Sequence, residues 1–314
     1  MSCRKVILGF AIADAIGVPV EFSWREDLKK NPVISMRGHG TYDQPAGTWS
    51  DDTTMTIATM ESITRLKNID YKDIMTNFAK WYKVGEFTID GLFDIGKTTS
   101  HAINRFLKGT PALDCGDKDI NSNGNGSLMR ILPIALYLHN KHGNSFTNED
   151  MDIIHNVSAL THAHQISKMC CGFYCLIASE LLESKSPKEA IAIGLSKGAD
   201  FYKRVPAFDT MLEHFDRLLD SGFANLPEDM IESSGYALHS FEAAIWCFLN
   251  TTDYKSLILK AVNLGRDTDT VGAIASGLGA LTYDVDDLPK EWINTLRKKE
   301  YLEKIENAFF NSLT

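Results

Sequence analysis

Oxygen-bearing side chains gather in three short segments of this 314-residue chain, at residues 14–21, 47–54 and 265–270. The side chains concerned are Asp14, Glu21, Ser50, Asp51, Asp52, Asp267, Asp269 and Thr270. Such hard oxygen ligands favour Mg²⁺ or Mn²⁺ over zinc. If acids from opposite ends of the chain converge, they can hold two metal ions about 3.5 to 4 Å apart that clamp substrate oxygens or activate water. The alternative is that these residues are helix caps and surface acids.

Residues 50–54 offer more than a helix cap needs, because capping takes one oxygen-bearing residue and here five are consecutive. Residues 267–272 match positions 1, 3 and 6 of an EF-hand loop. However, Val271 and Leu278 occupy positions 5 and 12, where calcium needs oxygen ligands. The sequence therefore does not predict an EF-hand.

Residues 91–98 satisfy the Walker A pattern of nucleotide-binding loops. Apolar side chains fill the positions where backbone amides should approach phosphate, Asp94 adds repulsion, and the chain lacks βαβ alternation. A P-loop NTPase is therefore an alternative with poor sequence context. We expect instead a loop that presents the N-terminus of a helix from Thr98 onward, which can still receive a phosphate.

The chain has the composition of an ordinary soluble globular protein, with 44% hydrophobic residues and a net charge of −9. No linker or abrupt shift in composition divides it, so we expect a single domain over residues 1–314. The pI near 5.5 and the absence of a basic cluster argue against binding of duplex nucleic acid. No apolar stretch reaches the roughly 18 residues of a membrane span. The oligomeric state is not predicted.

The six cysteines form no disulfide framework, and we interpret them as reduced thiols in the cytoplasm. A zinc site formed by residues 162–175 is an alternative, but its His and Cys spacing fits no common zinc site. Residues 4–13 imitate a short secretory signal, with cleavage after Ala13. We do not favour that interpretation, because the apolar region is short and the following residues carry acids of apparent function.

Helical patterns dominate the sequence, which predicts an all-α fold of about a dozen helices. Asp70 and Asp253 precede apolar helical patterns as N-caps, and residues 186–189 form a capping box. An apolar stripe over residues 212–219 is expected to end at Gly222.

Further helices are expected at 54–67, 98–108, 127–140, 149–184 with a break near Thr161, 237–250, 270–282 and 290–311. Pro133 is expected to kink or delay one of them. The strand-like runs 33–36 and 87–89 are too brief for a sheet core.

The acidic segments resemble the signature of the ADP-ribosylglycohydrolase family, which includes the dinitrogenase reductase-activating glycohydrolase. Four stretches carry the resemblance in order: residues 9–21, Trp49-Ser50-Asp51-Asp52-Thr53, Asn123-Gly124-Asn125-Gly126-Ser127-Leu128-Met129-Arg130 and Gly265-Arg266-Asp267-Thr268-Asp269-Thr270. Each is weak alone, but their order and spacing together are specific. Ala13 departs from the glycine usual in relatives, and Ser50 replaces a frequent threonine while keeping the hydroxyl.

The resemblance implies a compact all-α fold with two Mg²⁺ or Mn²⁺ ions at the base of a cleft. It implies hydrolysis of the glycosidic bond that joins ADP-ribose to a modified protein side chain, or to a related small ADP-ribosyl compound. The implied metal ligands are Ser50, Asp51, Asp52, Asp267, Asp269 and Thr270. The implied catalytic residues are Glu21, Asp51 and Asp269. The implied substrate-binding residues are Asp94, Gly96, Gly124, Asn125, Gly126, Ser127, His162 and Tyr236. An inactive relative that only binds ADP-ribose is the remaining alternative.

Overall fold

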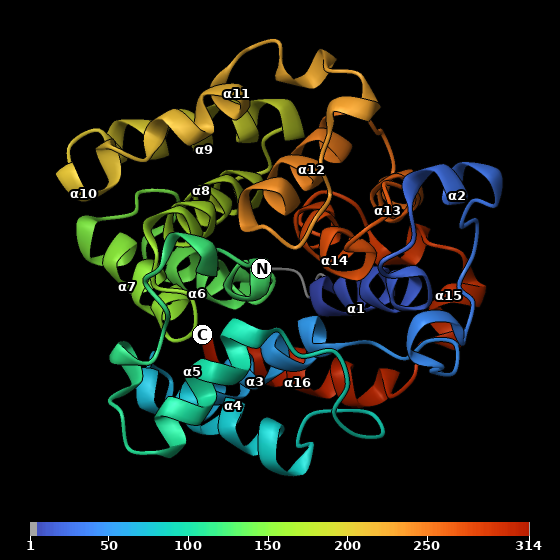
Figure 1. Ribbon diagram of the computed structural model, residues 1–314, viewed down its shortest axis with the longest axis horizontal. Coiled ribbons are helices and arrows are strands. Elements are labelled where there is room, and N and C mark those ends of the chain that lie inside the picture. The colour runs from blue at the N-terminus through green and yellow to red at the C-terminus, as the bar shows by residue number, and fades with distance from the viewer. Residues whose placement is uncertain (1–4, 314) are drawn as a thin grey trace.

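Helices form the regular structure of residues 5–313, the part of the chain that this computed structural model describes (Figure 1). The α-helices are α1 Val6–Gly17, α2 Arg25–Lys30, α3 Asp51–Leu66, α4 Tyr71–Val84, α5 Lys97–Leu107, α6 Leu132–His142, α7 Asn148–Ala159, α8 Gln165–Leu182, α9 Pro187–Tyr202, α10 Pro206–Asp209, α11 Asp216–Leu219, α12 Ala237–Leu249, α13 Tyr254–Asn263, α14 Thr268–Gly279, α15 Lys290–Thr295 and α16 Lys299–Leu313. The described residues contain isolated β-bridges but no strand. The predicted all-α fold is therefore confirmed.

Short 3₁₀ helices connect many of these elements. They are η1 Val18–Val20, η2 Gly40–Tyr42, η3 Ala112–Asp114, η4 Ile120–Ser122, η5 Asn125–Ser127, η6 Leu212–Phe215, η7 Phe223–Asn225, η8 Glu228–Met230 and η9 Val285–Asp287. The turns η1 and η5 bring the chain to the cleft that is described in the next section.

The helix starts that local chemistry predicts are confirmed. The Asp70 carboxylate accepts a hydrogen bond from the third amide of α4, and Asp253 does the same for α13. Ser186 and Glu189 form the predicted capping box at α9. The predicted break near Thr161 is also present, because α7 ends at Ala159 and α8 begins at Gln165.

Three predicted helices differ from the structure. The stripe 212–219 is split into η6 and α11, and Gly222 has a φ of −81°, so it is not a left-handed helix stop. The helix predicted from 127 begins at Leu132, because a 3₁₀ turn precedes it and Pro133 occupies its first turn. The stretch 290–311 is interrupted between α15 and α16.

The helices α1 and α14, from opposite ends of the sequence, lie side by side in the core (Figure 1). All residues of both helices are buried. A Cβ at Gly17 would lie only 2.3 Å from the Cα of Asp269, so the approach requires glycine. Thr268 fixes the contact, because its hydroxyl donates to the Gly17 carbonyl at 2.8 Å. The end of α1 is therefore held against the start of α14.

The structure also tests the alternatives of a secretory signal, a P-loop and a zinc site. The apolar part of the signal-like run belongs to α1 in the core, and Arg4 lies outside the described residues. No described strand precedes residues 91–98, as a P-loop would require. The cysteines among residues 5–313 are free and buried, and they join no metal-binding cluster there. No helix in the described part of the chain is both long and apolar enough to cross a membrane.

Candidate active site

The three acidic segments meet at one cleft of about 360 Å³. Ser50 is the N-cap of α3, and its hydroxyl accepts from the Asp52 amide at 3.2 Å. Asp267 is the N-cap of α14, and Glu21 directly follows η1. The lining residues are Glu21, Phe22, Asp51, Asp94, Ile95, Gly96, Lys97, Thr98, Thr99, Gly124, Asn125, Gly126, Met129, His162, Gly235, Asp267 and Thr270. Two helix N-termini thus present acids to one cavity.

Hydrogen bonds link the two halves of the sequence at this place. The hydroxyls of Ser50 and Thr270 both donate to Asp52 Oδ2, each at 3.1 Å, although Asp52 and Thr270 are 218 positions apart. Asp52 and Asp269 are fully buried. The six residues proposed as metal ligands from the resemblance are therefore gathered at one site.

Several acid oxygens in this site have no hydrogen-bond partner. They are Glu21 Oε2, Asp52 Oδ1, Asp267 Oδ1 and Asp269 Oδ2. Burial of an unpaired carboxylate is costly, so such oxygens mark a place for a cation. Two groups have the geometry for this: Asp14 with Asp52 and Asp269, and Glu21 with Asp94 and Asp269. Within each group, one ligand atom per residue lies within 4.8 Å of the others.

Burial and mutual repulsion shift the pKa values of these acids upward. Burial is the largest cause for Asp51, Asp52 and Asp269, and neighbouring carboxylates raise their pKa values further. Burial, followed by the charges of Asp94 and Asp267, raises the pKa of Glu21 to about 9. Without a cation, protons must neutralise part of this site.

Asp14 has a different environment from the other acids. It accepts hydrogen bonds from the Ser50 amide at 2.9 and 3.1 Å, the Thr53 amide at 3.1 Å and the Thr53 hydroxyl at 2.6 Å. Its carboxylate therefore holds the first turn of α3 in place. Sequence reasoning included Asp14 among the acids but assigned it no role; an acid in an otherwise apolar helix was the available signal.

Asp94 lies closer to the acids than the sequence interpretation implied. It was expected among the substrate-binding residues, but the structure places it in a potential metal-binding group with Glu21 and Asp269. Its backbone has a φ of +50°, an uncommon value for a residue with a side chain. Burial is the largest cause of its raised pKa.

The opposite wall of the cleft contains donors and glycines. Gly96 caps α5 without a side-chain hydrogen bond, and Lys97, Thr98 and Thr99 of the first turn line the cleft, so the N-terminus of this helix borders it. The side-chain amide of Asn125 donates to Asp267 Oδ2 at 2.8 Å and so joins the two walls. Gly124, Gly126 and His162 complete this wall, as expected from the sequence.

Two expected substrate-binding residues do not line the cleft. Ser127 is fully buried, and its hydroxyl accepts from Ser158 at 3.0 Å, so only its backbone shapes the loop. Tyr236 is the N-cap of α12, forms an isolated bridge with Gly124 and packs against His239 at 4.9 Å between ring centroids. Ligand contact by either side chain stays untested.

Aromatic rings stand at the mouth of the cleft, and sequence reasoning missed them. Phe22, next to Glu21, is 61% exposed and has a φ of +64°. Its ring centroid lies 6.4 Å from that of Tyr42, which in turn lies 5.2 Å from that of Phe93. No sequence pattern connects these residues, because they lie in separate segments: Phe22 shortly after η1, Tyr42 at the end of η2 and Phe93 in the loop before α5.

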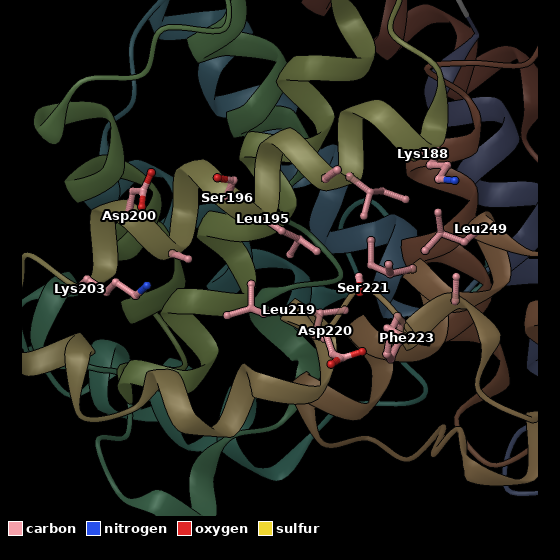
Figure 2. Close-up of a pocket in the computed structure, with 16 residues that line it drawn as sticks. Lys188, Leu195, Ser196, Asp200, Lys203, Leu219, Asp220, Ser221, Phe223 and Leu249 are labelled. Carbon is pink, nitrogen blue, oxygen red and sulfur yellow. The ribbon is translucent and has the colours of Figure 1, made fainter.

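Another cavity, of about 520 Å³, lies between α9, residues 218–224 and α12 (Figure 2). Its walls include Leu195, Leu219 and Phe223, whereas Lys188 and other charged residues stand at its edge. It shares no lining residue with the acid cleft. None of the site residues expected from the sequence lines this second cavity.

Comparisons with known proteins identify the family of this chain. An ADP-ribosylglycohydrolase family model matches residues 2–314. ADP-ribosylarginine hydrolase Tri1 of Pseudomonas putida is 29% identical, over 98% of this chain and 77% of its own length. ADP-ribosyl-[dinitrogen reductase] glycohydrolase of Rhodospirillum rubrum is 28% identical, over 93% and 89%.

A solved structure described as an ADP-ribosylglycohydrolase-related protein complex has a TM-score of 0.80 and 26% identity, and the match covers 99% of this chain and 98% of that one. The sequence match and the shared fold extend over nearly the whole chain. The chain belongs to the ADP-ribosylglycohydrolase family of hydrolases.

Proposed function

We propose that this chain, as a single domain over residues 1–314, hydrolyses the glycosidic bond between ADP-ribose and a modified arginine side chain. The observation that carries the proposal is the convergence of Asp52, Asp267 and Asp269, each with a buried oxygen that lacks a partner. This donor set fits two Mg²⁺ or Mn²⁺ ions, because both cations prefer carboxylate and hydroxyl oxygens.

The proposed ligands come from two helix N-termini. Ser50, Asp51 and Asp52 would hold the cations from α3, whereas Asp267, Asp269 and Thr270 would hold them from α14. Bound divalent cations supply positive charge that neutralises the acids and orients vicinal ribose hydroxyls. The protein contributes the rigid spacing of the ligands, which Asp14 and the Ser50 and Thr270 hydroxyls maintain.

Glu21 is the residue that we propose to act on the scissile bond. It lies at the cleft, its Oε2 has no hydrogen-bond partner, and burial favours its protonated form. In that form it can protonate the departing group, and as a carboxylate it can stabilise oxocarbenium-like charge on the ribose. Asp51 and Asp269 stabilise the same developing charge. Water completes the hydrolysis.

The wall opposite the acids suits the ADP part of the substrate. The N-terminus of α5 and His162 both line this wall. Backbone amides at a helix N-terminus bind anions, so we expect the wall to bind a diphosphate and not a cation. The cleft volume also falls in the ordinary range for small-molecule sites. An arginine linkage is supported by the names of two relatives that cover 98% of this chain. The substrate would be an ADP-ribosylated protein or a small ADP-ribosyl compound in the cytoplasm.

Release of free ADP-ribose tests this function. A protein ADP-ribosylated on arginine is incubated with the chain and Mg²⁺ or Mn²⁺, and the released nucleotide is quantified by chromatography. A serine-linked substrate tests the linkage in parallel, and Asp267→Asn is the control for contaminating activity. We expect release from arginine that depends on the cation. Tight binding of ADP-ribose without release from either substrate would instead indicate a binding protein.

A further inference from the structure

Arg130 is fully buried, and no carboxylate among residues 5–313 forms an ion pair with it. Its guanidinium lies 4.7 Å from the ring centroid of Phe78. Nη2 donates to the Val157 carbonyl at 3.2 Å and to the Thr161 hydroxyl at 2.8 Å, whereas Nε and Nη1 have no partner. Burial is the main cause that lowers its pKa, to about 10, so it remains charged at neutral pH. Such an arginine is costly, which indicates a role beyond packing.

The hydrogen bonds from Arg130 have a fixed direction. A guanidinium donates and never accepts, so the Thr161 oxygen must be the acceptor of the 2.8 Å bond. The same oxygen lies 2.8 Å from His162 Nδ1. The Thr161 side chain is buried, and among residues 5–313 no other acceptor lies within hydrogen-bond distance of its hydroxyl, so the hydroxyl proton is directed to Nδ1, which accepts it. An imidazole that accepts at Nδ1 and is neutral carries its proton on Nε2.

The surroundings keep His162 neutral. Its side chain is buried, and burial followed by the charge of Arg130 lowers its pKa to about 3. A second proton, on Nδ1, would also leave the Thr161 hydroxyl proton without an acceptor among residues 5–313. The ring is thus neutral throughout the physiological pH range.

The Nε2 edge of this ring faces the glycine loop of the cleft. A Cβ at Gly124 would lie 3.2 Å from Nε2, and one at Gly126 would lie 2.9 Å from Cε1. Both positions lack a side chain, so the edge stays open toward the cavity that His162 lines. Nδ1 has a partner, and no protein acceptor is found for Nε2 among residues 5–313.

We propose that Arg130 and Thr161 are positioning residues that hold His162 as the Nε2–H tautomer, a neutral donor to an anionic oxygen of the diphosphate. The proposal rests on the proposed function, because that function supplies the diphosphate. Each group donates a hydrogen bond to the next, from Arg130 to Thr161, from Thr161 to His162 and from His162 to the ligand. We call this chain of hydrogen bonds the relay. The start of α5 lies on the same wall and attracts the same negative charge.

Nuclear magnetic resonance can read the tautomer directly. Nitrogen and proton correlations are recorded on histidine-labelled protein, and His162→Asn identifies the signal among the nine histidines. We expect Nδ1 to be unprotonated and Nε2 to be protonated from pH 5 to pH 8. Addition of ADP-ribose should shift the Nε2–H signal, whereas adenosine should not. A proton on Nδ1, or titration of the ring in this pH range, would overturn the proposal.

Substitution of the relay hydroxyl supplies the second test. Thr161→Val removes the donor to Nδ1 and keeps the side-chain shape, so we expect ADP-ribose affinity to fall about tenfold, as for one hydrogen bond to a charged group. Thr161→Ser restores the hydroxyl and should restore both the affinity and the ring signals. Circular dichroism and thermal melting establish that each variant is folded. Equal affinity and equal ring signals in folded Thr161→Val would refute the relay.

The two proposals fail separately. If ADP-ribosylated arginine is not hydrolysed but His162 carries its proton on Nε2 and responds to ADP-ribose, the hydrolytic function is wrong and the relay stands. If hydrolysis proceeds while Nδ1 carries the proton, the relay is wrong and the function stands. A folded Arg130→Met variant gives a further measurement. Loss of the Arg130 charge should raise the pKa of His162, and loss of its hydrogen bond to Thr161 should let the ring proton move between Nε2 and Nδ1.

Discussion

Glu180 in α8 and Asp269 in α14 are both buried carboxylates, but their partners differ. Glu180 accepts from Lys197 at 2.5 Å and pairs with Lys185 at 2.9 Å. Burial alone would raise its pKa, but hydrogen bonds from these two lysines lower the pKa below its ordinary value. The charged groups that act most strongly on Asp269 are acids, and its pKa is raised by burial and then by Glu21. Glu180 forms ion pairs with two lysines, whereas no ion pair among residues 5–313 joins a lysine to an acid of the cleft.

The difference separates a stabilising ion pair from a site prepared for an external cation. A buried acid with its own cations contributes to the stability of the fold. A cluster of acids without them weakens the metal-free fold and gains when a divalent ion binds. Substitutions in the two regions should therefore have opposite consequences for stability and for metal binding.

The largest expected effect is on activity. Asp269→Asn removes one carboxylate ligand, so we expect turnover to fall at least about 100-fold and calorimetric metal binding to be lost. In the presence of a chelator, the melting temperature should stay or rise, because a repelling buried charge is gone. Asp229→Asn, which changes an exposed acid, is the matched control and should change neither quantity. Retained metal affinity in Asp269→Asn would contradict the ligand assignment.

Metal removal should change the stability of the wild-type chain. At a free cation concentration 100 times the dissociation constant, binding to the folded state alone adds about 2.7 kcal/mol. We expect the melting temperature to rise with Mg²⁺ or Mn²⁺ and to return after chelation, as measured by calorimetry. Ca²⁺ of equal concentration is a control for general screening. An equal response of Asp269→Asn to Mg²⁺ would show that the cation acts elsewhere.

Glu180→Gln should affect stability instead of metal binding. It removes the acceptor of two lysines, and because both lysines are partly exposed we expect a loss of about 1 to 3 kcal/mol in the free energy of unfolding. Chemical denaturation measures this loss, and titration calorimetry should give an unchanged metal affinity. The comparison between the two regions breaks down if Glu180→Gln weakens metal binding as Asp269→Asn does.

Local chemistry was enough to predict the acid segments and the main helix starts. Residues such as Asp70 and Ser186 act on amides within their own turn, so their roles can be inferred without the fold. The convergence of Asp52 with Asp269 was inferred from residue types and family resemblance. It depends on the packing of α3 and α1 against α14, which sequence spacing alone does not fix.

The parts that sequence missed depend on where a side chain points. Ser127 has the residue type of a ligand-binding hydroxyl, but the 3₁₀ turn directs it to Ser158 in the core. Asp14 contacts backbone amides 36 and 39 positions away, and Arg130 reaches Thr161 across 31 positions. Such contacts have no local signature, so only the folded chain reveals them.

The pH dependence of stability should separate the two regions with opposite signs. The pKa of Glu21 rises from 4.5 to about 9 on folding, so the folded chain binds this proton more tightly than the unfolded chain. Stability is therefore greatest below about pH 4.5 for this group and falls as pH rises toward 9, by at most about 1.4 kcal/mol per pH unit for one proton. Glu180 has a lowered pKa, so its contribution is present above its ordinary value of 4.5 and is lost on acidification.

Calorimetric melting of chelated protein between pH 5 and pH 9 measures this dependence. Glu21→Gln should reduce the loss at high pH, whereas Glu180→Gln should shift the whole curve downward over this range without changing its slope. With saturating Mg²⁺ the slope should flatten or reverse, because cations replace protons on the acids and bind more tightly as pH rises. Identical slopes in chelated wild type and Glu21→Gln would mean that Glu21 is not protonated in the metal-free cleft. Its proposed proton donation would then require the bound substrate to raise its pKa.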